Sequence, residues 1–177
     1  MKKILVLLVA VLMVFGLVGA AFAESGSAGE PQPAAENAAK VHHPKVKDLQ
    51  GFDQLIQLRA EGKATRDQIK ANHDQLKSLV QAARQSKNKQ ALEALKPFKS
   101  TLKQQHADMK ALGTTQKGNW EAMKEARQAN NEAQMQTILN QIISTRQTIN
   151  SKLLEIKTTL DQMIQALQTA PPAAPQQ

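Results

Sequence analysis

Apolar residues recur at alternating intervals of four and three between Glu132 and Gln168, a stretch that contains neither Gly nor Pro. The residues of this seam are Met135, Leu139, Ile142, Ile149, Leu153, Ile156, Leu160, Met163 and Leu167. Heptad spacing of this kind predicts one long helix whose apolar stripe packs against other helices. Such a stripe is not stable alone in water, so the rest of the chain is expected to cover it.

Arg146 is the residue that interrupts this seam. A guanidinium at a seam position either reaches outward along its aliphatic stem or pairs with an acid of a neighbouring helix or subunit. Arg146 is therefore a candidate for setting the register of the helices.

The same spacing predicts a first helix from about Lys47 or Asp48 to Gln85. Gly62 falls inside it, and the capping-box sequence Thr65–Gln68 offers an alternative start for a second helix. We expect one continuous or slightly bent helix, because the register continues through Gly62. The segment Ser86–Asn88 then supplies a turn and an N-cap.

A further helix after this turn is expected to end at Gly113, since Gly commonly terminates helices. Pro97 either bends this helix or begins a new one after a short turn. A loose connection through Gly118 and a short helix over residues 119–128 are expected next, with a turn at residues 130–131 before the final helix.

The predicted fold is therefore all-α, with elongated antiparallel helical hairpins of three to four long helices and coiled-coil-like seams over residues 48–168. Residues 24–47 and 169–177 are rich in Ala, Pro and polar residues, which predicts a disordered linker and tail. Residues 1–23 have the pattern of a secretory signal peptide: a basic start, an apolar run and an A-x-A cleavage site ending at Ala23. We expect an extracytoplasmic protein, in the periplasm, secreted or at the cell envelope.

Composition narrows the function classes. The chain has no Cys and no Tyr, and its formal net charge is +8, of which Lys2 and Lys3 supply two charges. Thiol catalysis and disulfides are excluded, and the few aromatic rings argue against nucleic-acid binding. No nucleophile–base pair, phosphate loop or dinucleotide motif is present, so neither an enzyme nor a bound cofactor is expected. A basic exported protein could meet an anionic envelope surface or acidic unfolded chains.

Two segments repeat. Residues 83–88 (ARQSKN) match residues 126–131 (ARQANN), and a Gln-terminated segment precedes each copy: residues 64–68 (ATRDQ) and residues 112–116 (LGTTQ). Each unit consists of a motif, a helix, an Ala-Arg-Gln turn and a second helix.

In these features the chain resembles the LTxxQ-motif family of periplasmic proteins (Spy/CpxP-like), over roughly residues 64–167. The positions that match the motif are Thr65, Gln68, Leu112 and Gln116. Ala64 stands where the first motif has Leu, and Gly113 where the second has Thr. The resemblance implies an ATP-independent chaperone or envelope-stress adaptor, dimeric with a second copy, that holds unfolded or partly folded proteins on a basic, partly apolar concave face.

A basic stripe beside an apolar row fits that role. The candidate client-binding residues are Lys96, Phe98, Lys99, Leu102, Lys103 and Lys110. Such a surface would attract a client at long range and then contact it through apolar groups. Alternatively, the lysine stems simply cover the edge of the core.

Two other functions remain open from the sequence. A metal-binding or metal-sensing envelope protein would use His residues, for which the adjacent His42 and His43 are weak candidates. His73 and His106 are expected roughly 7 Å apart along the helix axis, an unlikely pair for one ion. A structural coiled coil of the cell envelope is the third possibility.

Overall fold

The computed structural model describes residues 45–171, and all regular secondary structure in that range is helical. The elements are a short 3-10 helix η1 (Val46–Asp48), the long helices α2 (Phe52–Gln85), α4 (Lys96–Gln128) and α5 (Glu132–Thr169), and the short α3 (Lys89–Glu93). The all-α prediction is confirmed. The proposed signal peptide, most of the linker, His42 and His43 lie outside the described residues.

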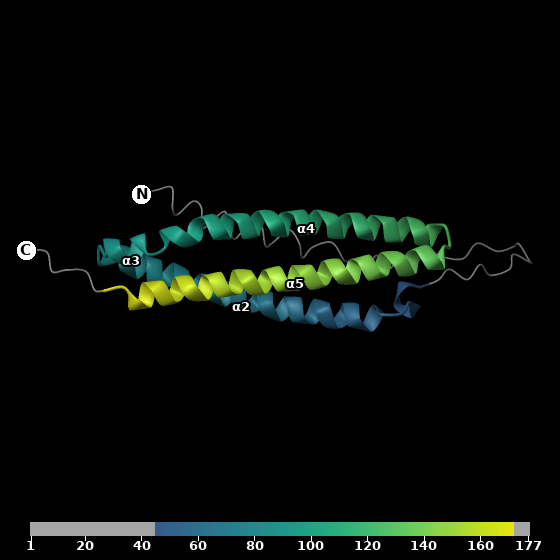
Figure 1. Cartoon of the computed structure of the whole chain (residues 1–177). Coiled ribbons are helices and arrows are strands. Elements are labelled where there is room, and N and C mark those ends of the chain that lie inside the picture. Colours follow the sequence, from purple (N-terminus) through teal and green to yellow (C-terminus); the bar gives the residue numbers. More distant parts are fainter. Residues whose placement is uncertain (1–44, 172–177) are drawn as a thin grey trace, which may run out of the picture. The chain divides into compact units, whose positions relative to one another are not determined.

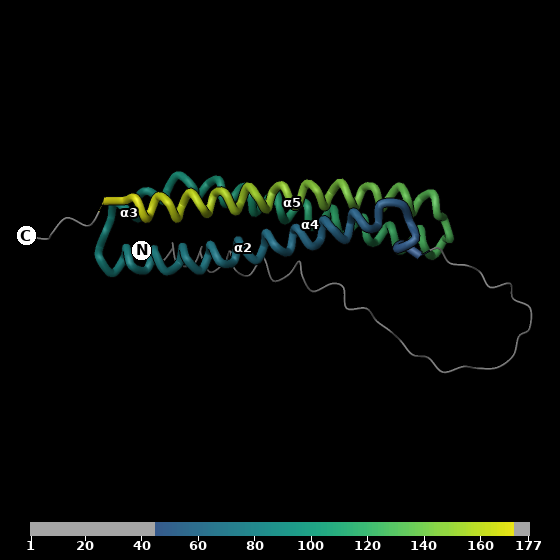
Figure 2. Tube along the Cα trace, turned by 90° about the horizontal axis from the view of Figure 1, so that it is seen from below, coloured from purple at the N-terminus to yellow at the C-terminus, as the bar shows by residue number. Residues whose placement is uncertain are grey.

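Helix α5 lies between the other two long helices and packs along both of them (Figure 1). The backbones of α2 and α4 approach each other only sparsely. Helix α4 runs opposite to α2 and α5, and α3 lies where the chain crosses from the end of α2 to the start of α4 (Figure 2). The apolar stripe predicted for residues 132–168 lies on α5, and α2 and α4 are the helices that cover it.

The apolar seam of α5 is buried along its whole length. Leu139, Leu153 and Leu160 have no exposed surface, and the other seam residues are also buried. Leu154, which lies off the seam, is 54% exposed. The heptad spacing therefore identified the buried face of α5 correctly.

A cluster of apolar side chains lies near the turn between α4 and α5, where the start of α2 joins them. The buried members of this apolar cluster are Leu49, Leu55, Met123, Ala126, Met135, Ile138, Leu139, Ile142 and Ile143. Phe52 and Trp120 pack against it from α2 and α4. Gly51 is the N-cap residue of α2 and has a φ of 90°, and a Cβ there would lie 3.1 Å from Ile143 Cδ1, so this position requires a glycine.

The two repeated turns have the same backbone geometry. Lys87 and Asn130 occupy equivalent positions and both have positive φ, 50° and 51°. The amide of Asn88 donates to Ala83 O at 2.8 Å, and the amide of Asn131 donates to Ala126 O at 2.9 Å. Each Asn side chain then accepts from the amide three residues on, at 3.0 Å. These bonds terminate one helix and cap the next, which makes the sequence repeat a repeat of structure.

Pro97 explains why the helices after these two turns differ in length. Helix α3 ends at Glu93, and Pro97 lies in the first turn of α4, where its missing N–H has no helical partner to lose. No proline follows Asn131 within α5, so that helix continues unbroken. Pro97 starts a new helix, which is one of the two outcomes expected.

The predicted break at Gly113 is wrong, because α4 continues through both Gly113 and Gly118 to Gln128. Neither glycine adopts a positive φ, so neither acts as a C-cap. A helical glycine costs only about 1 kcal/mol relative to Ala, which packing of the flanking turns against α5 can offset. Gly62 likewise lies inside the continuous α2, as expected. None of the described helices is both long and apolar enough to cross a membrane.

Candidate functional site

The predicted client-binding residues all lie on the first half of α4. Phe98 and Leu102 are half-buried, whereas the lysines beside them are exposed. We call this surface, formed by Lys96, Phe98, Lys99, Leu102, Lys103 and Lys110, the α4 face. Lys96 pairs with Glu93 of α3, and the other three lysines form no ion pair with a described residue.

Helix α4 is poorly anchored by apolar contacts beneath this face. Between Lys96 and Ala122 its only buried residues are Gln105 and Gln116. Met109 and Leu112, which occupy core-facing positions, remain half-buried. Apolar groups on the first two thirds of α4 therefore keep part of their surface in water.

Polar contacts replace apolar ones along the same stretch. Gln105 Nε2 donates to Thr159 Oγ1 of α5 at 3.0 Å in a buried environment. Asn119 Nδ2 donates to Thr145 Oγ1 at 3.3 Å. Lys152 Nζ of α5 lies 3.7 Å from Asp108 Oδ2 of α4 and 2.8 Å from Glu155 Oε2 of its own helix. The sequence pattern did not identify these polar contacts in advance. Polar side chains at heptad positions of α4 were the feature that could have indicated them.

His73 of α2 and His106 of α4 interact electrostatically. Burial lowers the pKa of His73, and the charge of His106 lowers it further, while Asp74 raises it. Burial also lowers the pKa of His106. Two imidazoles alone do not make a metal site, and no group of three or more potential ligands occurs among residues 45–171.

The four motif positions do not come together as one site. Thr65 Oγ1 donates to Glu61 O within α2, and Gln68 is exposed. Leu112 is half-buried and Gln116 is buried on α4. Their separation on two helices fits local structural roles.

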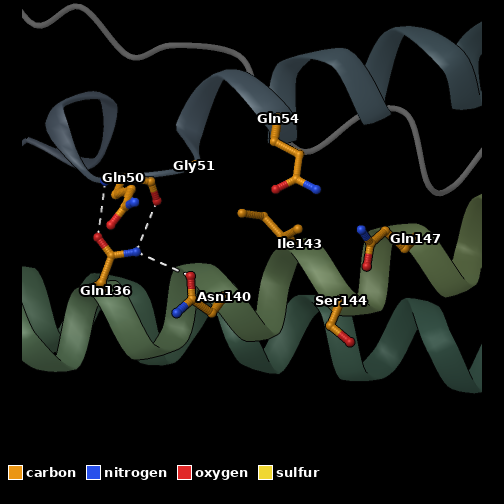
Figure 3. Close-up of a pocket in the computed structure, with 8 residues that line it drawn as sticks. All are labelled: Gln50, Gly51, Gln54, Gln136, Asn140, Ile143, Ser144 and Gln147. Atoms are coloured by element: carbon orange, nitrogen blue, oxygen red, sulfur yellow. Dashed lines mark hydrogen bonds between the residues drawn. The ribbon is translucent and has the colours of Figure 1, made fainter.

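An open polar hollow of about 490 Å³ lies between the start of α2 and the first half of α5 (Figure 3). It is lined by Gln50, Gly51, Gln54, Gln136, Asn140, Ile143, Ser144 and Gln147. Gln136 accepts from the Gln50 amide at 3.1 Å and donates to the Gln50 carbonyl at 2.9 Å. These bonds fasten the chain before α2 onto α5. The lining contains no acid or base, so this hollow has the character of a structural junction.

Comparison of the chain with protein-family models, with curated proteins and with solved structures found no match.

Proposed function

We propose that this protein is an exported, ATP-independent chaperone or envelope-stress adaptor that holds unfolded or partly folded proteins on the α4 face. The observation that supports this most is the incomplete burial of α4: it fully buries no apolar side chain between Lys96 and Ala122. Exposed lysines flank these half-buried apolar groups. Charge would attract an acidic or unfolded client, and apolar contact would then retain it.

The first test is aggregation of a chemically unfolded client diluted into buffer with stoichiometric mature protein. We expect slower aggregation at low salt and a weaker effect at high salt, because screening reduces the attraction of exposed charges. Absence of any suppression at low salt would remove the chaperone proposal.

Paired variants locate the binding surface. Replacing Lys99 and Lys103 by Gln should reduce suppression at least twofold, whereas replacing the exposed Lys63 and Lys70 of α2 by Gln removes the same charge and should not. For the apolar part, Leu102→Ala should reduce suppression, and Leu154→Ala, at an exposed site on α5, should leave it unchanged. Equal effects within either pair would assign binding to a different surface.

The proposal includes a finer architecture and a homodimer. We propose that α4 and α5 form an antiparallel hairpin with coiled-coil-like seams in an elongated molecule, and that two copies pair to form the concave client-binding face. Sedimentation of the mature chain tests both points, since an elongated dimer has twice the mass and a high frictional ratio. A compact monomer would contradict them.

A metal-sensing envelope protein is the second candidate, for which His73 of α2 and His106 of α4 are the residues to test, because the two side chains interact electrostatically. Calorimetric titration of the mature chain with zinc, copper and nickel tests it. Micromolar binding that His73→Gln removes would support it, and the absence of binding would end it. The third candidate, a structural coiled coil held at the envelope by charge, predicts salt-sensitive binding to purified cell walls without chaperone activity.

A further inference from the structure

One heptad away from the apolar cluster, each of the three long helices has a polar residue or a glycine at a position equivalent to an apolar residue of the cluster or beside it. The pairs, each seven residues apart, are Phe52 and Arg59, Leu55 and Gly62, Met123 and Gln116, and Leu139 and Arg146. Residues seven apart occupy equivalent faces of packed helices. We call Arg59, Gly62, Gln116 and Arg146, together with Asn150, the polar layer.

Asn150 enters the polar layer because Gly62 leaves room for it. A Cβ at position 62 would lie 2.5 Å from Asn150 Oδ1. The Asn150 amide donates from Nδ2 to the carbonyl oxygen of Leu58 at 2.8 Å. The close approach of α2 and α5 thus brings a polar side chain of one helix against the backbone of the other.

Three arginines converge on this layer from two helices. The Arg59 guanidinium lies over the Trp120 ring of α4, 5.2 Å from its centroid. Arg59 and Arg66 lie three and four residues from Gly62 on α2, and Arg146 lies four residues from Asn150 on α5, so all three flank the contact between Gly62 and Asn150. Burial lowers the pKa of Arg146, and the charges of Arg66 and Arg59 lower it further. All three side chains are half-buried. Of the two alternatives expected for Arg146, pairing with an acid of a neighbouring helix does not occur within residues 45–171, because no salt bridge there involves it.

Arg66 and Arg146 bring positive charge that no ion pair with a described residue neutralises. Asp67 acts on Arg66 electrostatically but forms no ion pair with it. Partly desolvated like charges are unfavourable unless an anion compensates them.

Hydrogen-bonding atoms in the layer also lack partners within the described chain. Gln116 is 9% exposed, and neither its Oε1 nor its Nε2 has a hydrogen-bond partner there. The same holds for Arg146 Nε and Asn150 Oδ1. A buried polar atom without a partner costs about 1–3 kcal/mol, and native proteins rarely leave several in one place.

We propose that the polar layer binds a small oxyanion of the phosphate type. Guanidinium groups match phosphate oxygens in geometry and charge, and Arg146 Nε and Gln116 Nε2 supply two further donors. The amide oxygens of Gln116 and Asn150 need donors instead, and the P–OH of hydrogen phosphate provides one. Sulfate carries no hydroxyl at neutral pH, so the site should prefer phosphate. This binding site is independent of the proposed chaperone function.

Inorganic phosphate titrated into the mature full chain tests the proposal, by calorimetry and by thermal unfolding at constant ionic strength. We expect saturable binding, a rise of several degrees in Tm and an affinity for sulfate several-fold weaker. Arg146→Met should weaken phosphate binding at least tenfold. Arg127→Met removes one exposed charge in the last turn of α4 and should leave binding unchanged.

The charge-neutral variant Gln116→Met keeps the test valid if Arg146→Met does not fold. It should weaken phosphate binding several-fold, because it removes a donor and an acceptor without changing net charge. The proposal would be overturned by the absence of saturable binding, by equal affinity for phosphate and sulfate, or by unchanged binding in both Arg146→Met and Gln116→Met.

Discussion

Two adjacent regions of the same three helices differ sharply in what fills the space between them. The apolar cluster near the turn between α4 and α5 is composed of aliphatic and Met side chains from every helix. The polar layer, one heptad further along, contains two guanidiniums, two amides and a glycine in equivalent places. The difference indicates that the apolar cluster contributes stability, whereas the polar layer costs stability and must be retained for another reason.

Helix α5 and the first part of α4 differ in a related way. Helix α5 buries an aliphatic residue in almost every turn, but α4 between Lys96 and Ala122 buries only two glutamines. The contacts of this part of α4 include hydrogen bonds such as that from Gln105 to Thr159, besides half-buried apolar groups. A hydrogen bond contributes only about 1 kcal/mol net, less than a fully buried Leu side chain. Helix α4 should therefore be the least firmly held of the three.

The largest expected effect comes from a pair of substitutions at equivalent positions of α5. Leu139→Ala should lower the free energy of unfolding by about 3 kcal/mol, because it leaves a cavity in the apolar cluster. Arg146→Ala should change it by less than about 1 kcal/mol, because the loss of stem packing is offset by relief of repulsion from Arg59 and Arg66. Urea unfolding measures both, and equal losses would contradict the contrast between the two regions.

Asn131→Ala should lower the free energy of unfolding by about 1 kcal/mol, because it removes the N-cap of α5 beside the apolar cluster. Asn88→Ala removes the equivalent cap from the five-residue α3. Its effect on global unfolding should be smaller, because α3 adds little to the packed core. Thermal unfolding of both variants compares the two repeated turns, and a larger effect at Asn88 would show that α3 is the better anchored end.

Gly113→Ala should raise the free energy of unfolding by up to about 1 kcal/mol, since Ala favours the helix and nothing lies within 4 Å of the added Cβ. Gly62→Ala should give no such gain, because its Cβ would displace Asn150 from Leu58 O. The double variant Gly62→Ala, Asn150→Ala should recover part of the gain. If Gly62→Ala alone stabilised the protein as much as Gly113→Ala does, Asn150 would not be held in the polar layer as described.

The smallest effect expected is a dependence of stability on pH. Because the pKa of His73 is lowered in the folded protein, the unfolded chain binds a proton more readily below the ordinary His value of about 6.5. Stability should be constant well above that value and should fall as the pH decreases below it. The groups acting on His73 are His106 and Asp74.

His73→Gln should reduce the loss of stability at low pH, measured as the change in Tm between pH 8 and pH 5. His106 should account for part of the loss that remains in this variant. An unchanged pH profile in this variant would show that burial of His73 is not the cause.

The sequence pattern predicted the buried face of α5, the end of α2 and both Asn-capped turns, because local sequence determines these features. The start of α2 was predicted too early, because a short 3-10 helix and a turn at Gly51 precede Phe52. The end of α4 was predicted wrongly, because tertiary packing overrode the weak helix preference of Gly113. The sequence left two alternatives open for Arg146, and its neighbourhood with Arg59 and Arg66 was not among them. A seam on one helix does not show which residues of the other helices share its layer, so the arginines and Gln116 could be grouped only once the three helices were placed side by side.

Native-state hydrogen exchange of the mature chain tests most directly the claim that α4 is held less firmly than α5. We expect the amides of α5 around Leu139 and Ile142 to be the most protected, close to the limit set by global unfolding. Amides of α4 between Phe98 and Gln116 should exchange at least tenfold faster. Equal protection along α4 and α5, or faster exchange in α5, would contradict the account.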